Sequence, residues 1–92
     1  MMDPARRDGH AIRSEITRFI VESFAEGSRP GAIRDGTKLL GGSLLDSIAM
    51  LELTVHLEET YGLTIAVEEI TLENFGTVDT LVRFVAGKVA AG

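Results

Sequence analysis

The sequence predicts an all-α fold: a small four-helix bundle, three helices long and one short, with a long loop between the first helix and the second. Three observations support this fold class. Apolar residues recur at helical spacing in three segments, and residues that favour helix ends flank those segments. Residues 63–67 alternate like a β-strand, but no second stretch is available to pair with them, so we expect an extended loop there. Because 92 residues can bury one modest core, we expect a single domain over residues 1–92 with its core within about 10–90.

The first helix is expected to begin at Asp3 and Pro4 and to end before Gly27. Asp is a common N-cap residue, and Pro is favoured at the first helical position. Gly9 is expected to interrupt this helix or to delay its start. The apolar side chains of the helix recur every three or four residues, at Ile12, Ile16, Phe19, Ile20 and Phe24.

The loop over residues 27–45 is rich in Gly, which interrupts helices and supplies turns. A loop of this length inside a compact domain is either functional or partly disordered. Its apolar residues suggest that it packs on the core; they are Ile33, Leu39, Leu40, Leu44 and Leu45.

The second helix is expected to start at Asp46 and Ser47 and to end at Tyr61, where Gly62 would adopt a left-handed conformation. A short helix should follow within residues 67–70 or 72–75. Thr77 is the expected cap of the last helix. The apolar stripe of that helix consists of Val78, Leu81, Val82, Val85 and Val89.

The formal net charge of −5 is concentrated in the second half of the chain. Between Asp46 and Asp79 there are eight carboxylates and no Lys or Arg. Such a surface repels nucleic acid and anionic membranes and attracts basic patches on proteins. The sequence has neither an apolar run long enough to span a membrane nor the apolar core of a signal peptide, so a cytoplasmic protein is expected. It also has no Cys, which excludes disulfides and a cysteine nucleophile.

The second helix has two apolar faces, one more than a small bundle needs. The core face consists of Met50, Leu53, Leu57 and Tyr61. The opposite face carries Ile48, Leu51 and Val55, and it is flanked by Glu52, Glu58 and Glu59. Either the long loop folds over this second face, or the face is an exposed patch that docks partners with basic rims.

Two serines, Ser43 and Ser47, lie where the loop meets the second helix. A helix N-terminus is electropositive, so a phosphate ester on Ser47 would be stabilised there, although Asp46 or Ser47 could serve only as a helix cap. A hydrolase is not expected. His56 lies ~13 Å along the helix from Ser47, too far for a catalytic base, and His10 is a lone polar residue on the first helix. There is no nucleophile elbow, phosphate-binding Gly loop or cluster of metal ligands.

The second helix resembles that of the acyl and peptidyl carrier proteins. The resemblance rests on Asp46, Ser47, Ile48, Leu51, Glu52, Leu53, Leu57, Glu58, Glu59, Tyr61 and Gly62. Flanking matches at residues 35–39, 68–70, 74–75 and 77–78 extend it over nearly the whole chain. In that family a phosphopantetheinyl transferase moves 4′-phosphopantetheine from coenzyme A to a serine. The arm supplies the thiol that this sequence lacks and holds acyl or aminoacyl groups as thioesters.

The resemblance implies that Ser47 carries the arm. In the family the modified serine stands about fourteen residues before the aromatic residue that ends the second helix, and Tyr61 stands at that place here. Residues 40–44 are similar to the peptidyl carrier motif, but Gly42 replaces the His or Asp that precedes the modified serine.

Other roles also follow from the resemblance. Asp46 matches an acidic position that helps the transferase hold its magnesium, and no metal site of the chain's own is expected. The residues that correspond to the docking surface of the family are Ile48, Leu51, Glu52, Val55, Glu58 and Glu59. Phe75, with Ile70 or Leu72, matches positions near which the arm or its cargo rests.

The chain looks most like a discrete, monomeric carrier of a polyketide or nonribosomal peptide type of natural-product pathway, and a domain of a larger synthase is the other option. Its partners would then be a phosphopantetheinyl transferase, an acyl- or aminoacyl-loading ligase, and a ketosynthase, acyltransferase, condensation or tailoring enzyme. Such a carrier is not itself an enzyme. The alternative is an unmodified helical adaptor that uses only the patch of Ile48, Leu51 and Val55 to bind proteins.

Overall fold

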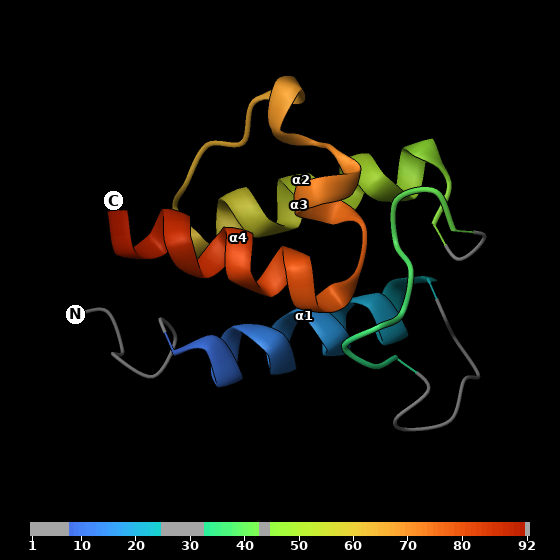
Figure 1. Cartoon of the computed structure of the whole chain (residues 1–92), viewed down its shortest axis with the longest axis horizontal. Helices are drawn as coiled ribbons and strands as arrows, with labels where there is room; N and C mark the ends of the chain where they lie inside the picture. The colour runs from blue at the N-terminus through green and yellow to red at the C-terminus, as the bar shows by residue number, and fades with distance from the viewer. Residues whose placement is uncertain (1–7, 25–32, 43–44, 92) are drawn as a thin grey trace.

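The computed structural model describes residues 8–24, 33–42 and 45–91, and it confirms the all-α fold (Figure 1). The three long helices are α1 (Gly9–Phe24), α2 (Ser47–Tyr61) and α4 (Val78–Ala91). Between α2 and α4 lie a single turn of 3₁₀ helix, η2 (Val67–Glu69), and a short α-helix, α3 (Leu72–Phe75). Both places expected for a short helix are therefore helical. Residues 63–66 form an extended loop, and the described residues contain no β-strand, only one isolated bridge between Lys38 and Thr77.

Helix α1 begins at Gly9, directly after Asp8. The Asp8 carboxylate accepts a hydrogen bond from the His10 backbone N–H at 3.1 Å, so Asp8 caps the N-terminus of α1. The expected cap at Asp3 and Pro4, and the expected stop at Gly27, lie outside the described residues. The core side of α1 matches the predicted stripe, because Ile12, Ile16 and Ile20 are fully buried, and α1 packs mainly on α4.

Helix α2 has the two ends that its sequence predicts. The Asp46 carboxylate accepts a hydrogen bond from the Ala49 backbone N–H at 2.7 Å. At the other end Gly62 has φ 65° and ψ 37°, and its N–H donates to the Glu58 carbonyl. The predicted core face is buried at Met50, Leu53 and Leu57 and half-buried at Tyr61.

The left-handed conformation at Gly62 leads to a stability prediction. A Cβ at this position would meet nothing within 4 Å, so Gly62→Ala changes only the backbone energy. We expect the free energy of unfolding, measured by urea denaturation, to fall by about 1 kcal/mol. Gly87→Ala is the matched control, because Gly87 lies in α4 with nothing within 4 Å and Ala favours a helix. An unchanged stability in Gly62→Ala would contradict the strain argument.

The described part of the long loop is attached to the region where α3 ends and α4 begins. The Leu39 N–H donates to the Gly76 carbonyl at 2.8 Å, and the Leu40 N–H donates to the Phe75 carbonyl at 3.0 Å. The loop also contributes buried side chains to the core at Ile33, Leu39 and Leu45. The expectation that the loop packs on the core is confirmed for these residues, while Leu44 lies outside the described part.

Helix α4 starts at a reciprocal cap. The Thr80 N–H donates to the Thr77 hydroxyl at 3.2 Å, and the Thr77 N–H donates to the Thr80 hydroxyl at 3.1 Å. Near its other end Lys88 donates to the Thr64 carbonyl at 2.7 Å and pairs with Glu69 at 2.9 Å, which ties the loop after α2 to α4. The predicted apolar stripe of α4 is buried throughout.

The helix directions place the start of α2 far from the end of α4. In Figure 1 α2 begins at one end of the long axis of the molecule, whereas α4 ends at the other. Within residues 8–24, 33–42 and 45–91, no helix combines the length and the apolar character that crossing a lipid bilayer would require.

Candidate functional site

Ser47 is the first residue of α2, and its side chain is exposed. The first backbone N–H groups of a helix have no acceptor within the helix, so this end carries a partial positive charge. Asp46 satisfies one of them, that of Ala49, and so fixes where the helix begins. A group attached to the Ser47 hydroxyl would therefore project into solvent at the electropositive end of α2. Ser43, the other candidate, lies outside the described residues.

The second apolar face of α2 is exposed. Ile48, Leu51 and Val55 have exposed fractions of 68%, 59% and 49%. The alternative in which the long loop covers this face is therefore wrong for the described part of the loop, which instead bonds to the end of α3 and the start of α4. Large apolar side chains held in water on a small protein are typical of a surface that binds another protein.

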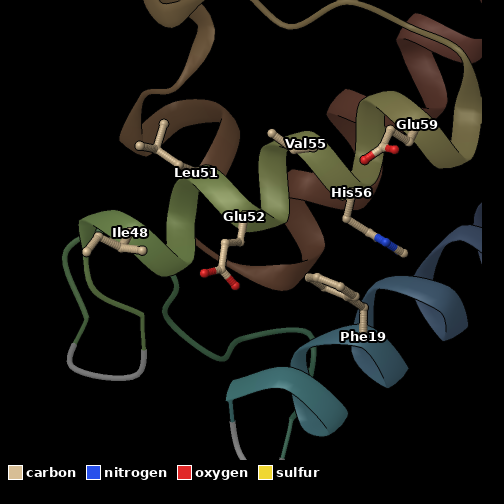
Figure 2. Close-up of a pocket in the computed structure, with 7 residues that line it drawn as sticks. All are labelled: Phe19, Ile48, Leu51, Glu52, Val55, His56 and Glu59. Atoms are coloured by element: carbon tan, nitrogen blue, oxygen red, sulfur yellow. The ribbon is translucent and has the colours of Figure 1, made fainter.

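A shallow groove runs along this face and reaches α1 (Figure 2). Its volume is about 420 Å³. Six of its lining residues come from α2, and the seventh, Phe19, comes from α1. The lining consists of Phe19, Ile48, Leu51, Glu52, Val55, His56 and Glu59.

The three glutamates predicted to flank the face have different surroundings. Glu52 and Glu59 are exposed and line the groove. Glu58 is half-buried, and its carboxylate accepts a hydrogen bond from the Ile65 N–H at 2.9 Å. Glu58 therefore holds the loop that follows α2, a role that the sequence reasoning missed because it depends on the path of that loop.

The positions expected to lie near the arm or its cargo also differ from one another. Phe75 is fully buried, with its ring centroid 5.6 Å from that of Phe84, so it belongs to the core and not to the exposed surface. Ile70 is half-buried against the same core, and Leu72 is 67% exposed. A role of Phe75 and Ile70 in binding an arm or cargo stays a prediction.

His56 is held by residues of α1. Its Nε2 atom lies 3.0 Å from the Glu15 carboxylate, and its ring stacks on that of Phe19 with a centroid distance of 3.8 Å. The sequence assigned Phe19 to the core stripe and gave His56 no role, so this pairing was missed. One weak signal was available: Phe19 stands at the edge of the α1 stripe, where a side chain can meet a neighbouring helix.

The Glu15 contact makes stability depend on pH. Partial burial raises the pKa of Glu15, but hydrogen bonds with Arg18 and His56 outweigh this effect and hold the pKa below its usual 4.5. A carboxylate with a lowered pKa in the folded state stabilises the fold above pH 4.5, and this stabilisation is lost as the pH falls through the lowered value. We expect Glu15→Gln to lower the free energy of unfolding at pH 7 by up to about 1 kcal/mol.

Urea denaturation at a series of pH values measures this effect. The difference between wild type and Glu15→Gln should shrink as the pH falls below 4.5 and vanish below the lowered pKa of Glu15, where both side chains are neutral. Glu68→Gln, at an exposed position on η2, is the control and should differ little from wild type at any pH. A difference for Glu15→Gln that stays constant down to acid pH would contradict the role given to its charge.

Comparison with known proteins supports the resemblance seen in the sequence. Residues 40–85 match a family model described as a phosphopantetheine attachment site. This segment contains both candidate serines and all of α2 and α3. The chain belongs to the acyl and peptidyl carrier protein family. Carrier proteins of this family hold 4′-phosphopantetheine covalently, receive it from a phosphopantetheinyl transferase and present it to partner enzymes. Carrier domains are typically not catalytic themselves.

A solved structure is similar to this carrier over most of its length. It is described as "Crystal structure of FAD-dependent dehydrogenase", and the match has a TM-score of 0.68 and 33% sequence identity. The match covers 76% of this carrier and 97% of the matched chain, so the matched chain is the shorter of the two. No curated protein matches the sequence.

The site of this carrier fits the group that its family holds. The attachment needs a hydroxyl that a transferase can reach and a surrounding that tolerates a phosphodiester. Ser47 offers an exposed hydroxyl at the positive end of a 15-residue helix. The exposed acids Glu52 and Glu59 lie farther along α2, beyond the first helical turn.

Proposed function

We propose that the protein carries acyl or aminoacyl groups as thioesters on a 4′-phosphopantetheine arm attached to Ser47. The observation that supports this most strongly is the exposure of the Ser47 hydroxyl at the first position of α2, inside the segment that matches the family. In the attachment step the Ser47 oxygen forms a new ester bond to the phosphorus of the pantetheine phosphate in coenzyme A. The pyrophosphate bond breaks, adenosine 3′,5′-bisphosphate leaves, and the hydroxyl proton goes to a base of the transferase.

The chain itself supplies a position and no catalytic group. When bound, the arm supplies a terminal thiol on which acyl groups are held. Asp46 fixes the start of α2 and thereby the place of the hydroxyl. As the resemblance implies, it would also help the transferase hold its magnesium. His56 is committed to Glu15 and Phe19 on α1, which supports a carrier without catalytic activity of its own.

The partners would dock on the exposed face of α2. Ile48, Leu51 and Val55 provide apolar contact, and Glu52 and Glu59 provide charge for basic residues of a partner. Asp46 and Glu58 would contribute at the two ends of this face, and Ile70 at its α3 side. Since Glu58 also holds the loop after α2, its replacement would disturb structure as well as docking.

We further propose that the protein is a carrier of a polyketide or nonribosomal peptide type of pathway. Its partners would include a loading ligase and a ketosynthase, acyltransferase, condensation or tailoring enzyme. The similarity to a chain in a structure described as an FAD-dependent dehydrogenase supports one tailoring partner in particular. We propose that a flavin-dependent dehydrogenase acts on the acyl group while the arm of this protein holds it.

The experiment that tests the carrier function is direct. The protein is incubated with coenzyme A, magnesium and a broad-specificity phosphopantetheinyl transferase, and its intact mass is then measured. We expect a gain of one phosphopantetheine. An unchanged mass, with a known carrier protein modified in a parallel reaction, would contradict the carrier and favour the unmodified adaptor that uses Ile48, Leu51 and Val55.

A further inference from the structure

Helix α1 forms one wall of the groove on α2. Figure 2 shows the Phe19 ring, on α1, lying against the His56 ring, on α2, at the side of the groove. The two rings are nearly parallel, with an interplanar angle of 10°. Phe19 is only half-buried, so the outer edge of this aromatic pair faces the groove.

Contacts within α1 and between the helices hold this wall in place. Glu15 binds His56 at 3.0 Å and Arg18 at 2.7 Å, and Phe19 also meets the Phe24 ring edge-on at 5.5 Å. The His56 side chain retains an exposed fraction of 22%. A surface that is held in this way before binding loses little conformational entropy when a partner docks.

The charge and length of the groove indicate what kind of partner it fits. Glu52 and Glu59 are its exposed charged residues, and none of the described residues that line it is Lys or Arg. From Ile48 to Glu59 it extends ~16 Å along α2, which is about three turns of a helix. An amphipathic helix with an apolar stripe and basic edges matches both features.

We propose that α1 belongs to the docking surface, through Phe19 and His56, and that this groove receives a basic amphipathic helix of a partner enzyme. The apolar stripe of that helix would lie between Leu51 and Val55 on one side and the aromatic pair on the other. Its Arg or Lys residues would pair with Glu52 and Glu59. This inference rests on the proposed carrier function, because it names the partner surface that such a carrier would use.

The test uses the full chain, uniformly labelled with ¹⁵N, and a synthetic helical peptide of 15 residues with Leu on one face and Arg at both edges. In NMR titration we expect saturable shifts at Phe19 and His56 together with Val55. The same peptide with Glu in place of Arg should bind at least about fivefold more weakly, because its charges repel those of the groove. Shifts confined to α2, or equal binding of both peptides, would overturn the inference.

Variants distinguish peptide binding in the groove from attraction of the peptide to the acidic surface in general. Glu59→Lys should weaken binding of the Arg peptide by about two- to fivefold, whereas Glu68→Lys, the same charge change at an exposed position outside the groove, should have a smaller effect. Phe19→Ala should also weaken binding. His56→Gln also removes the stacked ring pair, and it changes the side-chain volume less than Phe19→Ala does. It therefore replaces Phe19→Ala in this test if that variant does not fold. Equal effects of the two Lys variants would count against the groove.

The same samples distinguish this inference from the carrier function. Intact mass after treatment with coenzyme A and the transferase reports attachment at the serine independently of peptide binding. If the chain gains the arm but the NMR signals of Phe19 and His56 do not shift with the peptide, the inference about the groove is wrong and the carrier function stands. If the chain binds the peptide in the groove but never gains the arm, the carrier function, on which the inference rests, is wrong.

Discussion

Replacing Ser47 by Ala should abolish the gain of phosphopantetheine, whereas replacing Ser43 by Ala should leave it intact. This result is expected because a transferase needs an exposed hydroxyl as the nucleophile, and Ser47 presents one at the start of α2. The spacing from Ser47 to Tyr61 also matches the carrier family. The measurement is intact mass after incubation with coenzyme A, magnesium and the transferase, followed by peptide mapping of the modified residue.

The Ser47→Ala variant should remain folded, which makes the comparison clean. Ser47 is exposed, and the cap of α2 is provided by Asp46, which the variant retains. Circular dichroism and urea denaturation should therefore be close to wild type. Modification that persists in Ser47→Ala and disappears in Ser43→Ala would move the attachment site to Ser43 and contradict the assignment.

Phe75→Ala should be the most destabilising of the changes considered. Phe75 is fully buried and packs against Phe84, so its truncation removes a large apolar contact and leaves a cavity. Losses for buried Phe are about 3–5 kcal/mol, a large part of the total stability of a small domain. We expect the urea midpoint to fall steeply and the variant to be partly unfolded at 37 °C.

Leu72→Ala is the matched control for Phe75. Leu72 lies on the same short helix but is 67% exposed, so its truncation should change the free energy of unfolding by no more than about 0.5 kcal/mol. Comparable stabilities for Phe75→Ala and Leu72→Ala would show that Phe75 is not a core residue. That result would favour the place near the arm or its cargo that the resemblance implied for Phe75.

Local signals in the sequence were sufficient to predict the described helices, whereas the choice of Ser47 over Ser43 stays a prediction. Asp46 and Gly62 predicted both ends of α2, because a side-chain cap and a left-handed Gly are properties of a few neighbouring residues. The second apolar face of α2 also followed from helical spacing alone. Whether the loop covered it could not be decided from spacing, and the exposure of Ile48 and Leu51 answers that question.

The features that the sequence did not predict depend on how separate elements meet. From the sequence, Glu58 could not be distinguished from Glu52 and Glu59. In the structure, the loop after α2 places the Ile65 N–H where it donates to the Glu58 carboxylate. His56 and Phe19 are far apart in the chain, and only the packing of α1 beside α2 stacks their rings. Phe75 matched a position near the arm, but the folding of α3 against α4 buries it.

The opposite positions of the α2 start and the α4 end have a practical consequence for handling the protein. An affinity tag or a surface linkage placed after Ala91 would hold the molecule by the end away from Ser47 (Figure 1). A protein immobilised on a sensor chip in this orientation would keep its serine directed toward the flowing solution. Enzymes introduced in the flow would then reach it unhindered by the chip.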